Sequence, residues 1–199
     1  MSFYAIMNIS LLKAGDNMEK SYYINRLCLR VLSAEDSLMV LRFHENNRRY
    51  FEPYEPVKPD NFYTDVFQYN TLLAEESFFD DNYFFRYYVF CGSYTDPIGT
   101  VSFKKSASER PAAMTLGYKF DKRFWGNGFA YESISFLTDQ LFKTLDIQNI
   151  EAIVQPDNYR SINLLTKLGF VPAGDAPVNI ELSTGRINHH MYLLRPIHQ

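Results

Sequence analysis

Cysteine is scarce in this chain, which has only Cys28 and Cys91 among 199 residues. Neither belongs to a Cys-x-x-Cys pair, and the sequence has no His-rich tract and no His-Glu-x-x-His motif. It therefore lacks the ligand spacing of a metal site, and we expect no bound metal. Both cysteines lie in strand-like apolar runs, which predicts reduced, buried thiols and a cytoplasmic protein.

Long hydrophobic runs are also missing. No apolar run approaches the ~18 residues that a membrane-spanning helix needs. The first 20 residues have no basic segment ahead of a broken apolar stretch, so they resemble a signal peptide poorly. We expect residues 1–20 to form an N-terminal arm or an extra strand, and residues 21–199 to form a single domain.

Positive charge is not in excess, because 20 Lys and Arg residues oppose 23 Asp and Glu residues and leave a net charge of −3. Such a chain has no general attraction for nucleic acid or for an anionic membrane, and we expect neither as a partner. Only a local basic patch would hold an anion. The 17 Phe and 15 Tyr residues favour core packing over an aromatic binding groove.

Apolar patterning predicts a mixed α+β domain with helices on both faces of one sheet. Helices are expected from a Ser33 cap to residue 43, fading over 44–50, then over 61–77 and about 127–145. A last helix opens at Asp157 or Asn158 and is closed by Gly169. The expected strands cover residues 22–32, 83–91, 97–105, 112–120, 150–155, 177–183 and 187–194.

The stretch "RFWGNGFA" at residues 123–130 lies between an expected strand and an expected helix. The N–H groups of a first helical turn have no partner within the helix, and the helix dipole makes that end positive. Small residues at Gly126, Gly128 and Ala130 would let phosphate oxygens approach this backbone. Lys119, Lys122 and Arg123 lie beside it and could contact peripheral phosphates. The alternative is a helix start whose glycines serve only tight packing.

Two common phosphate motifs do not fit this stretch. The third small residue of the dinucleotide fingerprint would fall on Tyr131, and the stretch follows a series of meander strands. A Walker loop is excluded because no Gly-Lys-Ser/Thr follows.

The segments "GYKFDKRFWGNGFAYES" (residues 117–133) and "IEAIVQPDNYRSINLLTKLGF" (residues 150–170) together resemble the Gcn5-related N-acetyltransferases, or GNAT family. The resemblance covers residues 114–170 and is strongest to the branch of bacterial Rim-type ribosomal-protein N-terminal acetyltransferases. A fainter match includes Asn47-Arg48 and Pro53-Tyr54-x-Pro56. The family resemblance implies one GNAT domain over residues 21–199, monomeric or homodimeric. Its sheet is expected to be mixed, mostly antiparallel, and to have about seven strands.

The resemblance also implies acetyl-coenzyme A (acetyl-CoA) as the acetyl donor and a site for it. The family's phosphate loop, Gln/Arg-x-x-Gly-x-Gly/Ala, fits Arg123-x-x-Gly126-x-Gly128 literally. It also fits Trp125-x-x-Gly128-x-Ala130, which keeps the helix start in place. The two strands at residues 112–120 and 150–155 diverge in this fold, and the pantetheine arm lies between them. Unpaired backbone groups near Phe120 are expected to hydrogen-bond that arm as an added strand does. The residues expected to bind the donor are Tyr118, Phe120, Arg123, Trp125, Gly126, Asn127, Gly128, Phe129, Ala130, Asn158 and Lys167.

Ser161 and Glu181 are the expected catalytic residues by the same resemblance. Ser161 matches a serine that faces the donor sulfur, and it follows Asn158 by three residues, so the two share a helix face. A capping role is the alternative for both. Glu181 aligns with a family base if one residue is inserted after Phe170, and a solvated strand carboxylate is the alternative. His189 and His190 point to opposite strand faces, so at most one reaches the site, and packing or surface roles are favoured.

The acceptor is expected to be a primary amine, most of all the α-amine of a protein or peptide N-terminus. The alternatives are a small amine such as an antibiotic or polyamine, and an acyl-CoA-binding module without turnover. The segment "NNRRYFEPYEP" at residues 46–56 has mixed charge, whereas an acidic groove would favour a small cationic amine.

Overall fold

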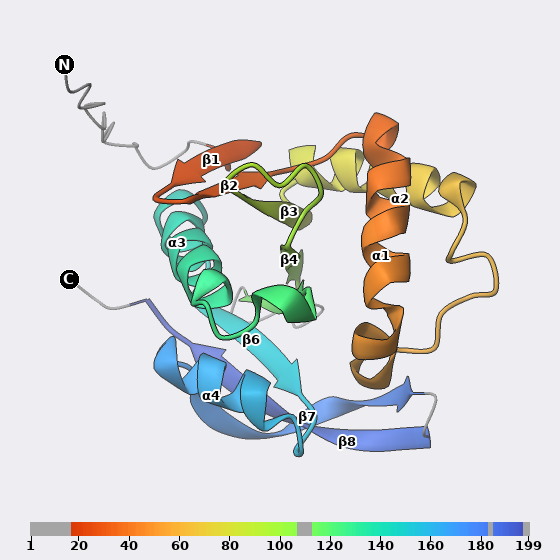
Figure 1. Ribbon diagram of the computed structural model, residues 1–199. Coiled ribbons are helices and arrows are strands. Elements are labelled where there is room, and N and C mark those ends of the chain that lie inside the picture. The colour runs from red at the N-terminus through yellow and green to blue at the C-terminus, as the bar shows by residue number, and fades with distance from the viewer. Residues whose placement is uncertain (1–16, 107–112, 183–184, 197–199) are drawn as a thin grey trace.

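The computed structural model describes residues 17–106, 113–182 and 185–196. Over these ranges the chain forms one eight-stranded sheet in the order β1-β2-β3-β4-β5-β6-β8-β7 (Figure 1). Neighbouring strands run antiparallel except β5 and β6, which are parallel. The strands are β1 (Ser21–Ile24), β2 (Leu27–Arg30), β3 (Phe84–Cys91), β4 (Gly99–Lys105), β5 (Ala113–Phe120), β6 (Asn149–Val154), β7 (Val171–Leu182) and β8 (Gly185–Leu194).

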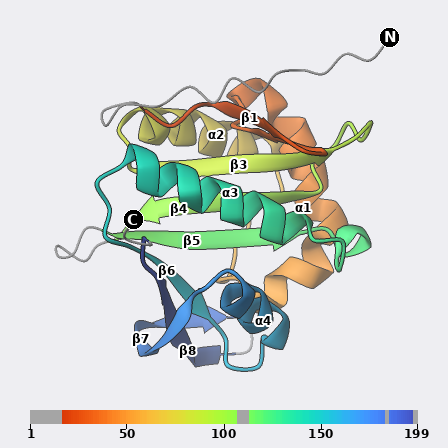
Figure 2. The same ribbon diagram turned by 90° about the vertical axis from the view of Figure 1, so that its left-hand side faces the viewer.

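Helices cover both faces of this sheet, as expected. Helices α1 (Ser37–Phe51) and α2 (Asp65–Asp80) lie on one face, and α3 (Phe129–Thr144) crosses the other, where α4 (Tyr159–Lys167) also lies (Figure 2). Short 3-10 turns precede α1 (Ala34–Asp36), follow it (Glu52–Tyr54) and precede α3 (Lys122–Phe124). None of the helices in the described ranges is both long and apolar enough to cross a membrane.

The main core lies between the sheet and α3. The helix buries Ile134, Leu137 and Leu141 completely, at the three- and four-residue spacing of an amphipathic helix. Phe85 and Phe103, from neighbouring strands, are also completely buried in this cluster. A smaller cluster under α1 and α2 is built from Leu32, Val40, Leu72, Tyr88 and Phe90.

Two sequence expectations for the N-terminal half are wrong. Residues 22–32 form the hairpin β1–β2 rather than one strand, because Asn25 turns the chain with a φ of 45°. Asparagine is one of the few residues with a side chain that adopts this conformation readily. The first helix does not fade at residue 44 but continues to Phe51, since His44 and Asn47 are buried on its inner face.

The C-terminal half follows the expected order with shifted bounds. Gly169 has a φ of 88° and lies just beyond α4, as expected for a residue that closes a helix. β7 begins at Val171, earlier than expected, and irregularities after Pro172 and Asp175 interrupt its pairing with β8. With the β1–β2 hairpin, the sheet has eight strands where about seven were expected. Residues 1–16 of the predicted N-terminal arm lie outside the described residues.

Candidate active site

Strands β5 and β6 separate partway along their length. Their parallel register ends at the pair Leu116–Ala152, although β5 continues to Phe120 and β6 to Val154. A cavity of about 530 Å³ occupies the space between them. Besides the two strands, its walls come from the end of α1 and the turn after it, from Trp125 and Ala130, from the start of α4, and from His189 of β8.

The β5 backbone presents polar groups to this cavity. The Asp121 N–H donates to the carbonyl of Ile98, and the Ala113 carbonyl accepts from the Ser106 N–H, both at 2.9 Å. The backbone groups at odd-numbered positions of β5 therefore bond toward β4. Because bonding direction alternates along an antiparallel pair, the N–H and C=O groups of Tyr118 and Phe120 point toward β6.

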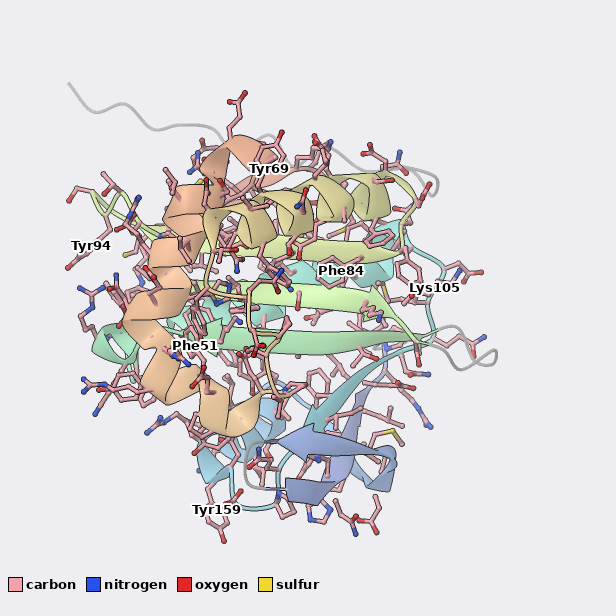
Figure 3. The ribbon with its side chains drawn as sticks, turned by 90° about the vertical axis from the view of Figure 1, so that its right-hand side faces the viewer. Phe51, Tyr69, Phe84, Tyr94, Lys105 and Tyr159 are labelled. Atoms are coloured by element: carbon pink, nitrogen blue, oxygen red, sulfur yellow. The ribbon has the colours of Figure 1, made fainter. Side chains whose placement is uncertain are left out.

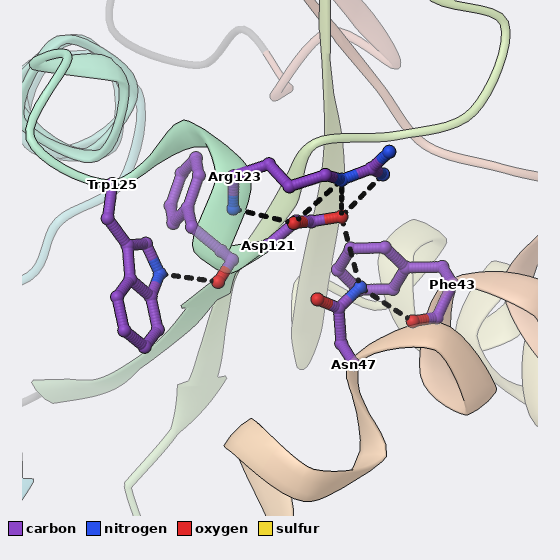
Figure 4. A network of polar contacts seen from close by, with 6 residues as sticks. Phe43, Asn47, Asp121, Arg123 and Trp125 are labelled. Carbon is purple, nitrogen blue, oxygen red and sulfur yellow. Dashed lines mark hydrogen bonds and ion pairs between the residues drawn. The ribbon is translucent and has the colours of Figure 1, made fainter.

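One of these backbone groups already has a partner. The indole N–H of Trp125 donates to the Phe120 carbonyl at 2.7 Å (Figure 4). The expectation of unpaired backbone groups near Phe120 therefore needs correction for this carbonyl, because the indole reaches back across the turn to it. The N–H of Phe120 and both backbone groups of Tyr118 lie beyond the last β5–β6 register pair.

The start of α3 is open. Its N-cap is Gly128, which has a φ of 82° and provides no side-chain cap, and the first helical bond runs from the Glu132 N–H to the Gly128 carbonyl. The N–H groups of Phe129, Ala130 and Tyr131 thus have no partner within the helix. Phe129 contributes only backbone here, since its ring is buried in the core. This geometry fits an anion such as a pyrophosphate.

Arg26 adds a cation at the same place, which the sequence did not reveal. Its guanidinium donates at 2.5 Å both to the carbonyl of Asn127 and to the carboxylate of Glu132, and it lies 4.2 Å from the ring centroid of Phe129. Arg26 comes from the β1–β2 turn. It was missed because residues 22–32 read as one strand.

Arg123 is directed elsewhere. Its guanidinium pairs with the buried carboxylate of Asp121 at 2.7 Å, and the Asp121 carboxylate also accepts from the Asn47 amide at 3.5 Å (Figure 4). Burial acts to raise the pKa of Asp121, but the hydrogen bonds from Arg123 outweigh it and hold that pKa below its usual value. Arg123 borders a second hollow beside α1 and is not part of the wall of the cavity between β5 and β6.

Ser161 and Tyr118 meet across the cavity. Their hydroxyl oxygens share a hydrogen bond of 2.5 Å, although one residue comes from α4 and the other from β5. Asn158 caps α4 by accepting the N–H of Ser161 on its side-chain oxygen at 3.2 Å, and it also lines the cavity. Burial raises the pKa of Tyr118 to about 12, while the hydrogen bond with Ser161 opposes this shift. The pair is therefore protonated at neutral pH and can donate a proton.

The opposite wall carries an ion-pair cluster that the sequence did not predict. Glu55 receives Lys119 on one carboxylate oxygen at 2.6 Å and Lys58 on the other at 3.0 Å. Burial lowers the pKa of Lys119 to about 8, although the carboxylate of Glu55 opposes this. The cluster links the segment after α1 to β5. The Lys119 ammonium nitrogen lies 5.3 Å from the ring centroid of Phe51, the last residue of α1, which is labelled in Figure 3. Lys119 thus faces away from the phosphate loop, beside which the sequence had placed it.

The remaining predicted residues are scattered. Lys167 is the last residue of α4, whose first turn borders the cavity, and it is not part of the cavity wall. Glu181 lies in β7 opposite Arg186 of β8, and its side chain is outside the described residues. His189 is buried and lines the cavity, whereas His190 is half-exposed and lies 3.3 Å from Asp175, as expected for neighbours on opposite strand faces.

The two cysteines are less buried than the sequence predicts. Cys28 and Cys91 are free thiols, but both are half-buried rather than fully buried. Among the side chains that the structure describes, no three His, Cys, Asp or Glu residues are grouped as metal ligands.

Known proteins share both the sequence pattern and the fold. Residues 26–171 match the family model described as an acetyltransferase (GNAT) domain. The probable N-acetyltransferase YjcK of Bacillus subtilis is 28% identical over 155 residues, which are 78% of this chain and 86% of that protein. The ribosomal protein uS5-alanine N-acetyltransferase of Escherichia coli is 27% identical over 153 residues, 76% of this chain and 78% of that one.

Solved structures show the same fold. The ribosomal-protein-S5-alanine acetyltransferase of Vibrio fischeri superposes with a TM-score of 0.82 at 24% identity, covering 89% of this chain and 97% of that one. RimL, a ribosomal L7/L12 alpha-N-protein acetyltransferase solved in complex with coenzyme A, gives a TM-score of 0.76 at 18% identity, over 86% of this chain and 95% of that one.

Proposed function

The chain belongs to the GNAT acetyltransferase family, and from this premise we propose that it acetylates the α-amine at the N-terminus of a protein or peptide. It is an acetyl-CoA-dependent N-acetyltransferase. The observation that carries the proposal is the cavity between β5 and β6, with a proton-donating pair on one wall and an ion-pair cluster on the other. The likeness to uS5-alanine acetyltransferases supports an α-amine as the acceptor.

Several groups in the described residues are suited to bind parts of the donor. The free N–H groups at the start of α3, with Arg26 beside them, suit a pyrophosphate. The backbone of Tyr118 and the N–H of Phe120 suit the amide groups of a pantetheine arm, which they would bond as an added strand does. The side-chain oxygen of Asn158 serves as the α4 cap, so its amide NH₂ is the part directed to the arm.

The transfer exchanges one bond for another. The amine nitrogen forms a bond to the thioester carbonyl carbon, the carbon–sulfur bond breaks, and the sulfur takes a proton. We assign that proton to the Ser161–Tyr118 pair. The Phe120 N–H is assigned to stabilise the negative charge that develops on the thioester carbonyl oxygen. The amine loses its proton to Glu181 or to water, and this step is easy for an α-amine, whose pKa is about 8, compared with about 10.4 for lysine.

A panel of acceptors tests this proposal. The protein is incubated with acetyl-CoA and N-terminal peptides, N-acetylated versions of the same peptides, polyamines and aminoglycosides, and free thiol is measured. We expect release with free N-terminal peptides and none with the blocked versions. Turnover of small amines alone would instead show a small-molecule acetyltransferase.

Donor binding is tested separately. Acetyl-CoA at about 100 times its Kd should stabilise the fold by about 2.7 kcal/mol, because only the folded chain presents the open helix start. Stabilisation without turnover of any amine would indicate a non-catalytic acyl-CoA-binding module. The free thiols of Cys28 and Cys91 are consistent with a reducing compartment, and the cytoplasm is part of the proposal.

A further inference from the structure

A second hollow, of about 550 Å³, adjoins the cavity and is lined largely by basic and polar side chains. It lies between the last turns of α1 and the 3-10 turn before α3. Tyr50 borders both spaces, and its ring lies edge-on to Trp125 at a centroid distance of 5.8 Å. A molecule that occupies both spaces would therefore contact Tyr50.

Two cations are held around the Tyr50 ring. The guanidinium carbon of Arg49 lies 4.6 Å from the ring centroid, and the ammonium nitrogen of Lys122 lies 4.9 Å from it. Cations are attracted to the face of an aromatic ring, so Tyr50 brings together two like charges from separate elements. Neither cation has a carboxylate partner within the described part of the chain.

The nearby carboxylates are already engaged. Glu52 pairs with Arg48, Asp121 pairs with Arg123, and Glu55 is shared by two lysines. The charges of Arg49 and Lys122 thus remain uncompensated at this place, in a chain whose net charge is −3. Two uncompensated cations at the entrance of a cavity attract an anionic group.

We infer that Arg49 and Lys122 bind a carboxylate of the acceptor, so that the preferred substrate is a polypeptide with Asp or Glu among the first few residues after its N-terminus. The inference rests on the proposed function. Because Tyr50 borders both spaces, an acceptor whose α-amine lies in the cavity can extend its next residues into this hollow. A phosphate of the donor is the competing anion, but the unpaired N–H groups at the start of α3 already offer it a site.

The test uses two matched peptides with the same first residue, one with Asp and Glu at positions two to four and one with Asn and Gln there. We expect kcat/KM to favour the acidic peptide by about two- to fivefold per carboxylate at low salt, and the preference to shrink at high salt. The double variant R49M/K122M should lose the preference. Arg42→Met is the matched control, because Arg42 is an exposed cation of the same helix that pairs with Asp96, and it should keep the preference.

Three results would overturn the inference. The first is equal kcat/KM for the two peptides with the unmodified protein, and the second is an undiminished preference in the double variant. The third is a rise in KM for acetyl-CoA, but not for 3′-dephospho-acetyl-CoA, in the double variant, which would assign the cations to the donor. Acetylation of peptides without acid preference refutes this inference alone, whereas turnover of small amines and of no peptide refutes the proposed function as well.

Discussion

Gly99 begins β4 directly opposite Phe120 of β5, and the Phe120 ring lies over its Cα atom. A Cβ atom added at Gly99 would be 2.3 Å from Cδ1 and 2.5 Å from Cε1 of that ring. Phe120 is only 7% exposed and belongs to the main core, so its ring is packed against neighbouring side chains. Gly99→Ala therefore forces the ring or the β5 backbone to move.

Overpacking of this kind costs about 1–3 kcal/mol of folding free energy. The gain of about 0.4–1 kcal/mol that alanine brings by restricting the unfolded chain offsets part of it. We expect urea unfolding of Gly99→Ala to show a lower midpoint with an unchanged slope, and Tm to fall by about 2–4 °C per kcal/mol. Binding of acetyl-CoA should weaken too, since Phe120 is the last β5 residue at the cavity.

Two comparisons isolate the cause. Gly117→Ala places its Cβ 3.0 Å from the Ser102 hydroxyl oxygen, a smaller conflict, and should cost less. Phe120→Leu combined with Gly99→Ala should lose less stability than the two single changes added together, because the smaller side chain relieves the conflict. A Gly99→Ala protein as stable as the original, or a double variant with strictly additive losses, would refute this reasoning.

Two further predictions concern the cavity walls. Ser161→Ala and Tyr118→Phe should each lower kcat by about 100-fold or more, with little change in the Kd of acetyl-CoA. The double variant should have the same kcat as either single variant, because the two hydroxyls share one hydrogen bond. Normal turnover in either single variant would exclude that hydroxyl from the mechanism. The pKa of Lys119 is about 8 in the folded chain and about 10.4 in the unfolded chain. Between these two pH values the unfolded chain binds more protons than the folded chain. The free energy of unfolding should therefore rise, relative to that of Lys119→Met, as the pH increases from about 8 to about 10. A pH-independent difference in denaturation would contradict it.

Structural features that depend on residues close together in the sequence, such as the two helix starts at the cavity, were predictable. The glycines before α3 and the apolar spacing after them were sufficient to predict an open helix start, and Gly128 is its N-cap. The spacing of Asn158 and Ser161 likewise predicted that they share a side of the helix, and both residues line the cavity.

Contacts between residues distant in sequence were not predictable in this way. The pair of Glu55 and Lys119 depends on a proline-rich turn folding back on β5, and nothing in either segment indicates the other. The position of Arg26 was not predicted, because it depends on a turn that only Asn25 indicates in the sequence. The length of α1 was not predicted either, because tertiary packing buries the polar residues His44 and Asn47. Arg123 was expected to bind a phosphate, but in the folded chain its guanidinium forms an ion pair with Asp121.

The short β5–β6 ladder has a mechanical consequence. Within the described residues, four residue pairs, from Ala113–Asn149 to Leu116–Ala152, form the strand pairing between β6, β8 and β7 and the larger part of the sheet. Beyond them, side-chain bridges such as the bond from the Gln155 amide to the Pro53 carbonyl span the divide. One hydrophobic core continues beneath both parts of the sheet, so the divide lies only in the strand pairing. We expect a molecule bound in the opening to bridge β5 and β6 and to slow amide exchange in both strands together.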